Sequence, residues 1–375
     1  MREYVIQKRT FDDLRVVTRH QLLNYPEVNF KKKLKSFIKS IIFDKNLMKV
    51  NGYFWPNGLL ATSLEWCYHA SEDSRDLLSL QKYYDAWISK GASIHYIDQA
   101  INGYSLIYLH QLSKNIKYKK TIDAIIEFLF LYPKAYDGCL PYRRGDSGII
   151  LVDGIGMTCP FLCRYGSVYN NPLAIELALT QLINYINKGF DDSIYLPYHG
   201  YDPVNNIKVG IIGWGRGVGW LLIGMVDSLE YIPKSNPHYN FIADSFNKTI
   251  SSIVNYQNKD GCFNWQVTAK DGYTDTSATS MISYAIRRGI MIGILNCSFL
   301  NYSNLALNSL HNSTMNGLVL DCSSECKGIS MYPQNYGAFP WAQGPTTALT
   351  ALSIIEDGIF LDKTNTSEFR LLSNS

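Results

Sequence analysis

The stretch from Asn102 to Leu129, NGYSLIYLHQLSKNIKYKKTIDAIIEFL, contains two helical patterns of different character. Its first half is apolar on nearly every side of a helix, and its second half, after a short break, carries charges at helical spacing. An apolar helix followed by an amphipathic one is typical of a hairpin whose first helix lies inside and whose second helix covers it. Such a hairpin cannot bury both faces alone, so it predicts neighbours of the same kind.

The same pattern recurs along the chain. Strong copies begin at Asn57, Gly154 and Gly217, and weaker copies begin at Ser277 and Gly344. Six hairpins closed into a ring bury their inner helices completely, so we predict an all-α (α/α)6 barrel of six helical hairpins. The alternative is an open solenoid of helix pairs. The irregular spacing of the copies, about 45 to 67 residues, favours the closed ring over a tandem array.

Composition and charge limit the class of protein. The 375 residues are 46% hydrophobic and 18% charged, which is ordinary for a soluble globular protein, and we expect a single domain over residues 1–375. With 35 basic and 32 acidic residues the formal net charge is only +3. The densest basic patch, FKKKLK at residues 30–35, is better explained as a solvated helix face than as a nucleic-acid site. We therefore expect no nucleic-acid partner.

The cysteines bear on whether the protein binds a metal, and the N-terminal sequence bears on where in the cell it is located. The eight cysteines include no CxxC motif, and no histidine lies at ligand spacing beside the pairs that are four residues apart, so we expect neither a metal nor a cofactor. Residues 1–17 lack the apolar segment of a signal peptide, and no stretch reaches 18 uncharged apolar residues. We expect a reduced, cytoplasmic protein without a membrane partner, either a monomer or a homodimer.

The segments that precede the inner helices should meet at one rim of a closed barrel, where sites on loops are usually built. They contain polar and aromatic side chains that suit a sugar, because aromatic rings stack on its C–H faces, arginine pairs with a carboxylate and aspartate supplies acid–base chemistry. The candidates are Asp98, Tyr142, Arg143, Arg144, Asp153, His199, Asp202, Trp214, Arg216 and Trp220.

Each candidate also has a structural explanation. Asp153 is the only charge before Arg164 in LVDGIGMTCPFLCRYG (151–166), and burial of such a carboxylate requires a partner or a raised pKa. Asp98 and Asp153 are equally well explained as helix N-caps, and His199 as a hydrogen-bonded loop histidine. Arg216, within WGRGVGW, favours a site because glycines allow close approach and two tryptophans flank the cation.

On these segments the chain resembles the unsaturated glucuronyl and rhamnogalacturonyl hydrolases, the glycoside hydrolase 88/105 group of (α/α)6 barrels. The resemblance extends from about Tyr53 to Ile355. It depends on four motifs in this order and spacing: DQAINGYSLIYLH, VDGIGMTCPFLCRYG, YHGYD and GWGRGVGWLLIGMVDSLEYIP, the last from Gly213. DTSATSMISYAIRRGI is similar to the segment that opens the fifth inner helix of the group.

The resemblance implies an unusual reaction. Members of the group remove the 4,5-unsaturated uronic acid that polysaccharide lyases leave at a non-reducing end, by hydrating its double bond. It implies that Asp153 donates a proton to C4 and helps water to add at C5, and that apolar neighbours raise the pKa of Asp153. It further implies that Asp98 stays ionised, that His199 and Arg216 hold the ring and its carboxylate, and that Trp214 and Trp220 form walls.

The loop before Asp153 departs from the group. Many members carry a histidine and a tryptophan there, whereas this chain has YRRGDSGIILVDG, in which Tyr142 or Arg143 would substitute for them in binding the oligosaccharide substrate. Two other hypotheses therefore stay open. One is an inverting hydrolase of saturated glycosides with Asp98 as base and Asp153 as acid. The other is a sugar-binding barrel that has lost its chemistry.

Overall fold

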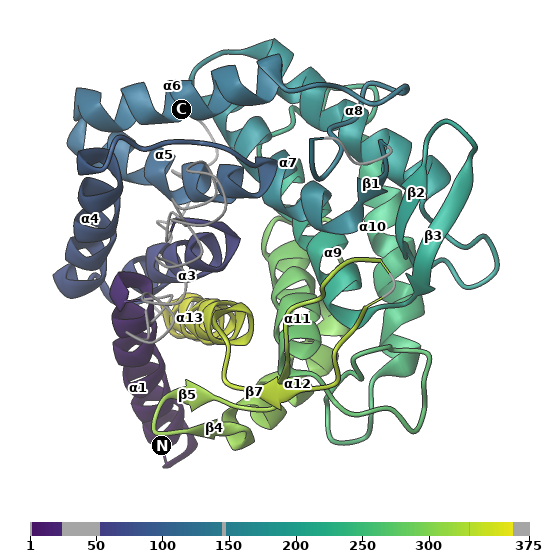
Figure 1. Ribbon diagram of the computed structural model, residues 1–375. Helices are drawn as coiled ribbons and strands as arrows, with labels where there is room; N and C mark the ends of the chain where they lie inside the picture. The colour runs from purple at the N-terminus through teal and green to yellow at the C-terminus, as the bar shows by residue number, and fades with distance from the viewer. Residues whose placement is uncertain (1, 25–52, 145–147, 330, 363–375) are drawn as a thin grey trace, which may run out of the picture.

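Two concentric rings of helices form the molecule (Figure 1). The computed structural model describes residues 2–24, 53–144, 148–329 and 331–362. The inner ring consists of α3 (Trp55–Ser71), α5 (Ile101–Ser113), α7 (Val152–Val168), α9 (Gly215–Leu229), α11 (Thr276–Met291) and α13 (Pro340–Asp362). The outer ring consists of α4 (Ser74–Ser89), α6 (Ile116–Leu131), α8 (Pro172–Lys188), α10 (Tyr239–Ile253), α12 (Leu300–Asn312) and α1 (Arg2–Asn24). Single turns of 3₁₀-helix lie at η1 (Ile97–Ala100), η2 (Val254–Tyr256) and η3 (Cys297–Phe299).

The inner ring is closed. Each inner helix packs against the next one along the chain, and α13 packs against α3, which completes the circle. The predicted (α/α)6 barrel is thereby confirmed, and the open solenoid is excluded because its first and last helix pairs would not touch.

Burial of the two rings follows the hydrophobic pattern of the sequence. Every residue of α9 is buried, as expected of a helix that is apolar all round. In α10 the buried residues recur at helical spacing on one face, from Tyr239 through Ile242, Phe246 and Ile250 to Ile253. The core therefore lies between the rings and inside the inner one.

The sixth helix pair differs from the order that the repeats predict. The outer partner of α13 is α1, from the beginning of the chain, and not a helix that follows α13. Ion pairs hold α1 to α4, with 2.5 Å between Arg15 and Asp73 and 2.6 Å between Arg19 and Asp76. The basic patch at 30–35 lies outside the described residues, and the single domain over residues 1–375 stays a prediction.

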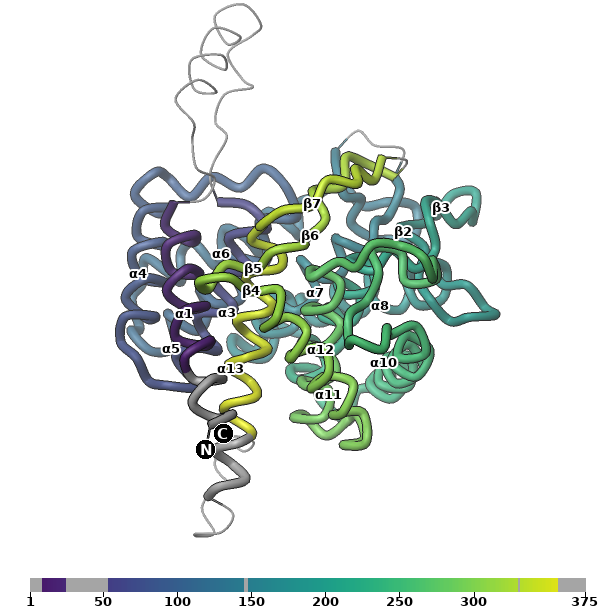
Figure 2. Tube along the Cα trace, turned by 90° about the horizontal axis from the view of Figure 1, so that it is seen from below, coloured from purple at the N-terminus to yellow at the C-terminus, as the bar shows by residue number. Residues whose placement is uncertain are grey.

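Short strands gather at the end of the barrel where the inner helices begin (Figure 2). An antiparallel sheet joins β1 (Ile150–Leu151), β2 (Tyr198–Asp202) and β3 (Ile207–Ile212) in that order, with Leu151 opposite Gly200. Two further pairs precede α13, and they are β4 (Thr314–Met315) with β5 (Leu318–Val319) and β6 (Cys322–Ser323) with β7 (Tyr336–Gly337).

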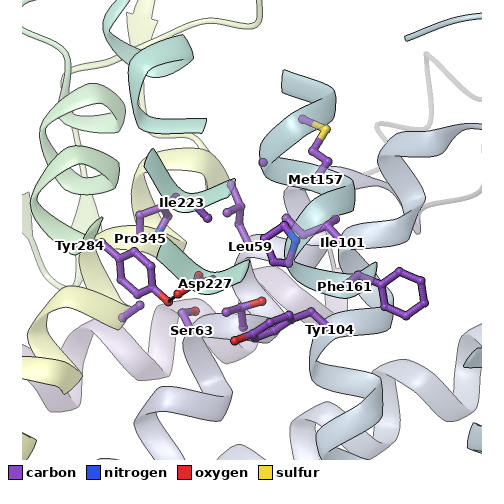
Figure 3. A pocket seen from close by; sticks show the side chains of 14 residues that line it. Leu59, Ser63, Ile101, Tyr104, Met157, Phe161, Ile223, Asp227, Tyr284 and Pro345 are labelled. Carbon is purple, nitrogen blue, oxygen red and sulfur yellow. Dashed lines mark hydrogen bonds between the residues drawn. The ribbon is translucent and has the colours of Figure 1, made fainter. Parts of the chain in front are cut away.

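A small cavity of about 30 Å³ lies on the barrel axis (Figure 3). All six inner helices contribute to its lining, for example Leu59 from α3, Tyr104 from α5 and Pro345 from α13. Among the described residues that line it, Asp227 of α9 is the one carboxylate, and it accepts a hydrogen bond from Tyr284 of α11 at 3.0 Å.

Closure depends on a close approach between α13 and α3 at Gly344. A Cβ atom at this position would lie 2.9 Å from both the carbonyl carbon and the oxygen of Leu59. Backbone atoms cannot move aside as the end of a side chain can, so a larger residue at 344 forces the two helices apart.

We predict that Gly344→Ala lowers the free energy of unfolding by about 1–3 kcal/mol, because the extra methyl group overpacks the helix contact that closes the ring. Urea unfolding followed by circular dichroism measures this. Gly337→Ala is the control, because a Cβ there meets Phe339 at an ordinary 3.4 Å. Equal stability of the two variants would contradict the assignment of Gly344 to ring closure.

Candidate active site

A pocket of about 450 Å³ opens at the end of the barrel that carries the strands. Six of the predicted residues line it together, although they come from distant parts of the chain: Tyr142, Arg143, Asp153, His199, Trp214 and Arg216. Asp98 lies against two of them, because its carboxylate bonds to Arg143 and Tyr142. Trp220, Asp202 and Arg144 lie elsewhere, as described below.

Asp153 and His199 are brought together by the pairing of β1 with β2. Asp153 is the second residue of α7, directly after β1, and His199 precedes the Gly200 that faces Leu151 across the sheet. His199 Nε2 lies 3.1 Å from Asp153 Oδ2. Leu151 is the N-cap of α7 and no side chain caps this helix, so Asp153 is not an N-cap.

Asp98 lies in η1 beside α5 and is the more deeply buried of the two aspartates. Its side chain is 4% exposed, against 13% for Asp153. Arg143 donates to Asp98 Oδ2 at 2.9 Å, and the Arg143 guanidinium lies between the rings of Tyr96 and Tyr142 at 4.7 and 4.1 Å. Asp98 Oδ1 is buried without a hydrogen-bond partner among the residues that the structure describes.

Burial also affects the charge state of Asp98. The resemblance implied an ionised Asp98 and an Asp153 with apolar neighbours. Burial raises the pKa of Asp98 above its ordinary value, and the nearby Arg143 opposes that shift in part. Asp153 faces the pocket with His199 as its partner, and Ile149 and Leu151 are among the apolar residues of the same lining.

Arg216, in the first turn of α9, links several segments at the rim through hydrogen bonds. Its guanidinium donates to Ser277 Oγ, to the backbone and side-chain oxygens of Ser323, and to the carbonyl of Ser324, over 2.8–3.2 Å. The same group lies over the ring of Trp214, 5.0 Å from its centroid. Arg216 therefore lines the pocket and also fixes β6 to α9.

Trp220 does not form a wall of the pocket. It is fully buried, and its ring meets Trp55 edge-on at 5.8 Å below the pocket. Its position within α9, well beyond the helix start, explains the error, because only residues at the beginning of an inner helix reach the rim. Trp55, the first residue of α3, lines the pocket instead.

Two further rim candidates also point elsewhere. Asp202 accepts from the backbone N–H of Val204 at 2.9 Å and so stabilises the turn between β2 and β3. Arg144 lies over the rings of Phe128 and Tyr132, on the outer helix layer. The Asp202 side chain therefore stabilises a turn, and the Arg144 side chain makes cation–π contacts.

The segment between β6 and β7 supplies pocket residues that sequence reasoning missed. Glu325, Cys326 and Lys327 line the pocket, and Tyr332 contacts His199 from behind. Partial loss of contact with water raises the pKa of Glu325, while Arg216 opposes the shift. The available signal was position, since this long aperiodic segment precedes the sixth inner helix just as the other rim segments precede theirs.

A helical barrel whose end pocket is lined by carboxylates, a histidine, arginines and indole rings is suited to an enzyme that processes carbohydrates. The model of Glycosyl Hydrolase Family 88 matches residues 30–346, and the chain belongs to this family. It is therefore a glycoside hydrolase, of a family whose members include unsaturated uronyl hydrolases.

Relatives agree with this assignment. The unsaturated rhamnogalacturonyl hydrolase YesR of Bacillus subtilis is 24% identical over 238 residues, which cover 62% of this chain and 69% of the relative. A possible member of family GH105 from Klebsiella pneumoniae has a TM-score of 0.82 at 16% identity, covering 92% of this chain and 93% of its own. The unsaturated glucuronyl hydrolase of Bacillus sp. GL1 has a TM-score of 0.69 at 16% identity, covering 94% and 97%.

Among the described helices, none is both long enough and apolar enough to span a bilayer.

The raised pKa of Asp98 leads to a prediction about stability. The native state holds the Asp98 proton more tightly than the unfolded chain does, so stability falls as pH rises through the raised pKa. Asparagine at this position cannot ionise. We expect Asp98→Asn to unfold at a higher temperature than the wild type at pH 7, and the difference to shrink as pH falls through the pKa of Asp98.

Differential scanning fluorimetry across a pH series measures this difference. Asp192→Asn is the control, because the Asp192 side chain is fully exposed and is expected to give no such gain. An Asp98→Asn variant that is less stable than the wild type at every pH would show that the pairing with Arg143 outweighs the cost of burying the carboxylate.

Proposed function

We propose that this enzyme removes a 4,5-unsaturated uronic acid from the non-reducing end of lyase-generated oligosaccharides by hydrating the double bond. The observation that carries the proposal is the placement of Asp153. Its carboxyl group faces the pocket at the start of α7, with one oxygen bonded to His199, while the family assignment supplies the class of reaction. YesR, named for its action on unsaturated rhamnogalacturonyl groups, supports the same reading.

The proposed reaction uses Asp153 twice. As a carboxylic acid it donates its proton to C4 of the vinyl ether, which leaves positive charge shared between C5 and the ring oxygen. As the resulting carboxylate it accepts a proton from the water that adds at C5, so its own proton is restored. The hemiketal at C5 then opens to a ketone, which leaves the former ring oxygen as a hydroxyl on C1. The hemiacetal so formed at C1 breaks down to an aldehyde and releases the remaining oligosaccharide, whose oxygen takes up the hydroxyl proton.

The other pocket residues bind and stabilise. Trp55 and Trp214 offer ring faces to the sugar, and the positive charge of Arg216 faces the uronate carboxylate. Asp98 Oδ1, buried without a partner in the described structure, is suited to accept a hydrogen bond from a sugar hydroxyl. Ionised Asp98 would also stabilise the positive charge that develops in the ring.

The relatives are named for different substrates, so the sugar next to the unsaturated uronate has to be identified by experiment. We propose that the loop at 142–144, where Arg143 replaces the aromatic and imidazole groups expected there, contacts the sugar next to the unsaturated uronate. Unsaturated disaccharides with rhamnose or with an amino sugar in that position would be compared by their kcat/KM values.

We predict that Asp153→Asn lowers kcat on an unsaturated disaccharide by about 100- to 10,000-fold, the usual contribution of a general acid–base group. Loss of the ultraviolet absorbance of the double bond measures turnover. Asp202→Asn is the matched control, since Asp202 serves only the β2–β3 turn and its replacement is expected to keep full activity.

Three outcomes would contradict the proposal. Full activity of Asp153→Asn would remove Asp153 from the reaction. Turnover of saturated but not unsaturated glycosides, with inversion at the anomeric carbon, would establish an inverting hydrolase instead. Binding of an oligosaccharide in a calorimeter without any product would establish a sugar-binding protein.

A further inference from the structure

Tyr332 forms the outer end of a chain of hydrogen bonds that leads to Asp153. Its hydroxyl lies 2.6 Å from His199 Nδ1, and His199 Nε2 lies 3.1 Å from Asp153 Oδ2. Within the described structure Tyr332 is not among the residues that line the pocket, so it stands behind His199 as seen from a bound sugar. It cannot act on the substrate except through the imidazole.

His199 has little freedom to choose other partners. Its side chain is 2% exposed, and its ring packs on Trp214 with 4.5 Å between centroids. Both ring nitrogens are engaged, so the tautomer is set by what each partner donates. A neutral imidazole has one N–H and one bare nitrogen, and these two must match a donor on one side and an acceptor on the other.

The surroundings of Tyr332 indicate that its hydroxyl is the donor. The backbone N–H of Ile211 donates to the Tyr332 oxygen at 3.5 Å, which leaves the hydroxyl hydrogen free to point at Nδ1. Burial raises the pKa of Tyr332, so the hydroxyl keeps its hydrogen. Nδ1 is then the bare nitrogen and Nε2 carries the hydrogen that faces Asp153.

We propose that Tyr332 is a positioning residue that holds His199 in the Nε2–H tautomer, so that the acid proton of Asp153 stays on Oδ1, the oxygen not bonded to His199. With the opposite tautomer, Nε2 would be bare and would accept the acid proton from Oδ2, away from the sugar. This inference rests on the proposed function for its catalytic consequence, but the tautomer itself does not depend on it.

The backbone of β3 is adapted to this contact. Gly210 has a φ of +79°, a conformation that favours glycine. A Cβ atom there would lie 2.6 Å from His199 Cβ and 3.0 Å from the Tyr332 hydroxyl oxygen. A side chain at 210 would therefore separate the tyrosine from the imidazole, which indicates that the local fold makes room for this pair.

The first test replaces only the hydroxyl. Tyr332→Phe keeps the ring that packs against Trp214 and Trp265, and we expect kcat to fall about 10- to 100-fold with less than about a threefold change in KM, as for other groups that orient a catalytic side chain. Tyr198→Phe is the control, because Tyr198 adjoins His199 on β2 but bonds to Asp191 instead. Wild-type kcat in Tyr332→Phe would overturn the proposal.

The second test reads the tautomer directly. Nitrogen-15 NMR of the histidine rings, with His199 assigned by its loss in His199→Asn, should show a protonated Nε2 and a bare Nδ1 in the wild type, and a changed tautomer population in Tyr332→Phe. A proton on Nδ1 of the wild type would overturn the proposal. Because this measurement needs no turnover, a protein inactive on unsaturated sugars would refute the proposed function and leave the tautomer result standing.

A double-mutant cycle completes the test. If Tyr332 acts only through His199, then Tyr332→Phe should change kcat less than about twofold in a His199→Asn background, whereas independent effects would multiply. An equal loss in both backgrounds would show that Tyr332 acts by another route.

Discussion

The barrel and its pocket both follow from one helix contact, in which Gly344 of α13 lies against the backbone of Leu59 in α3. It closes the ring, and closure places the starts of all six inner helices around one opening. Residues 98, 153 and 216 share no local sequence environment, yet each stands at or just before the start of an inner helix. The pocket therefore results from closure of the ring, and the short strands at the rim then set the positions of individual side chains.

The pairing register of β1 and β2 determines how Asp153 and His199 lie relative to each other. Leu151 faces Gly200, so Asp153, two residues further, and His199, one residue earlier, meet on the same side. A shift of one residue in this pairing would turn the imidazole to the other face of the strand and leave Asp153 without its partner. Toward the other ends of the inner helices, buried ion pairs join Arg164 to Glu65 at 2.8 Å and Arg288 to Asp227 at 3.0 Å.

The fold and most of the pocket could be predicted because both follow from periodicity. Apolar helices recur, they must be inner helices, and the residues before them must meet. The predictions that failed depended on where individual side chains point, which periodicity does not give. Trp220 looked equivalent to Trp214 in WGRGVGW, but six residues along a helix carry a side chain about 9 Å down the axis, out of the rim and into the core.

The residues between Cys322 and Tyr336 have no helical or strand period. Their position before the sixth inner helix places them at the rim, but it does not indicate that Tyr332 turns back onto His199 while Glu325 and Lys327 face the pocket. The burial of Asp98 was equally hidden, because it depends on where the Arg143 side chain lies, and that is decided by its fit between two tyrosine rings.

The two aspartates differ in their environments. Asp98 is held under Arg143 with one oxygen unpartnered among the described residues, an arrangement that costs stability. Asp153 stands closer to the pocket, with a histidine fixed from behind by a tyrosine. Burial raises the pKa of Asp98, whereas the bond to His199 orients the carboxyl group of Asp153. In the reaction that we propose, this difference would let the Asp98 carboxyl stay in place as an acceptor for a sugar hydroxyl while the Asp153 carboxyl gives up and regains its proton at each turnover.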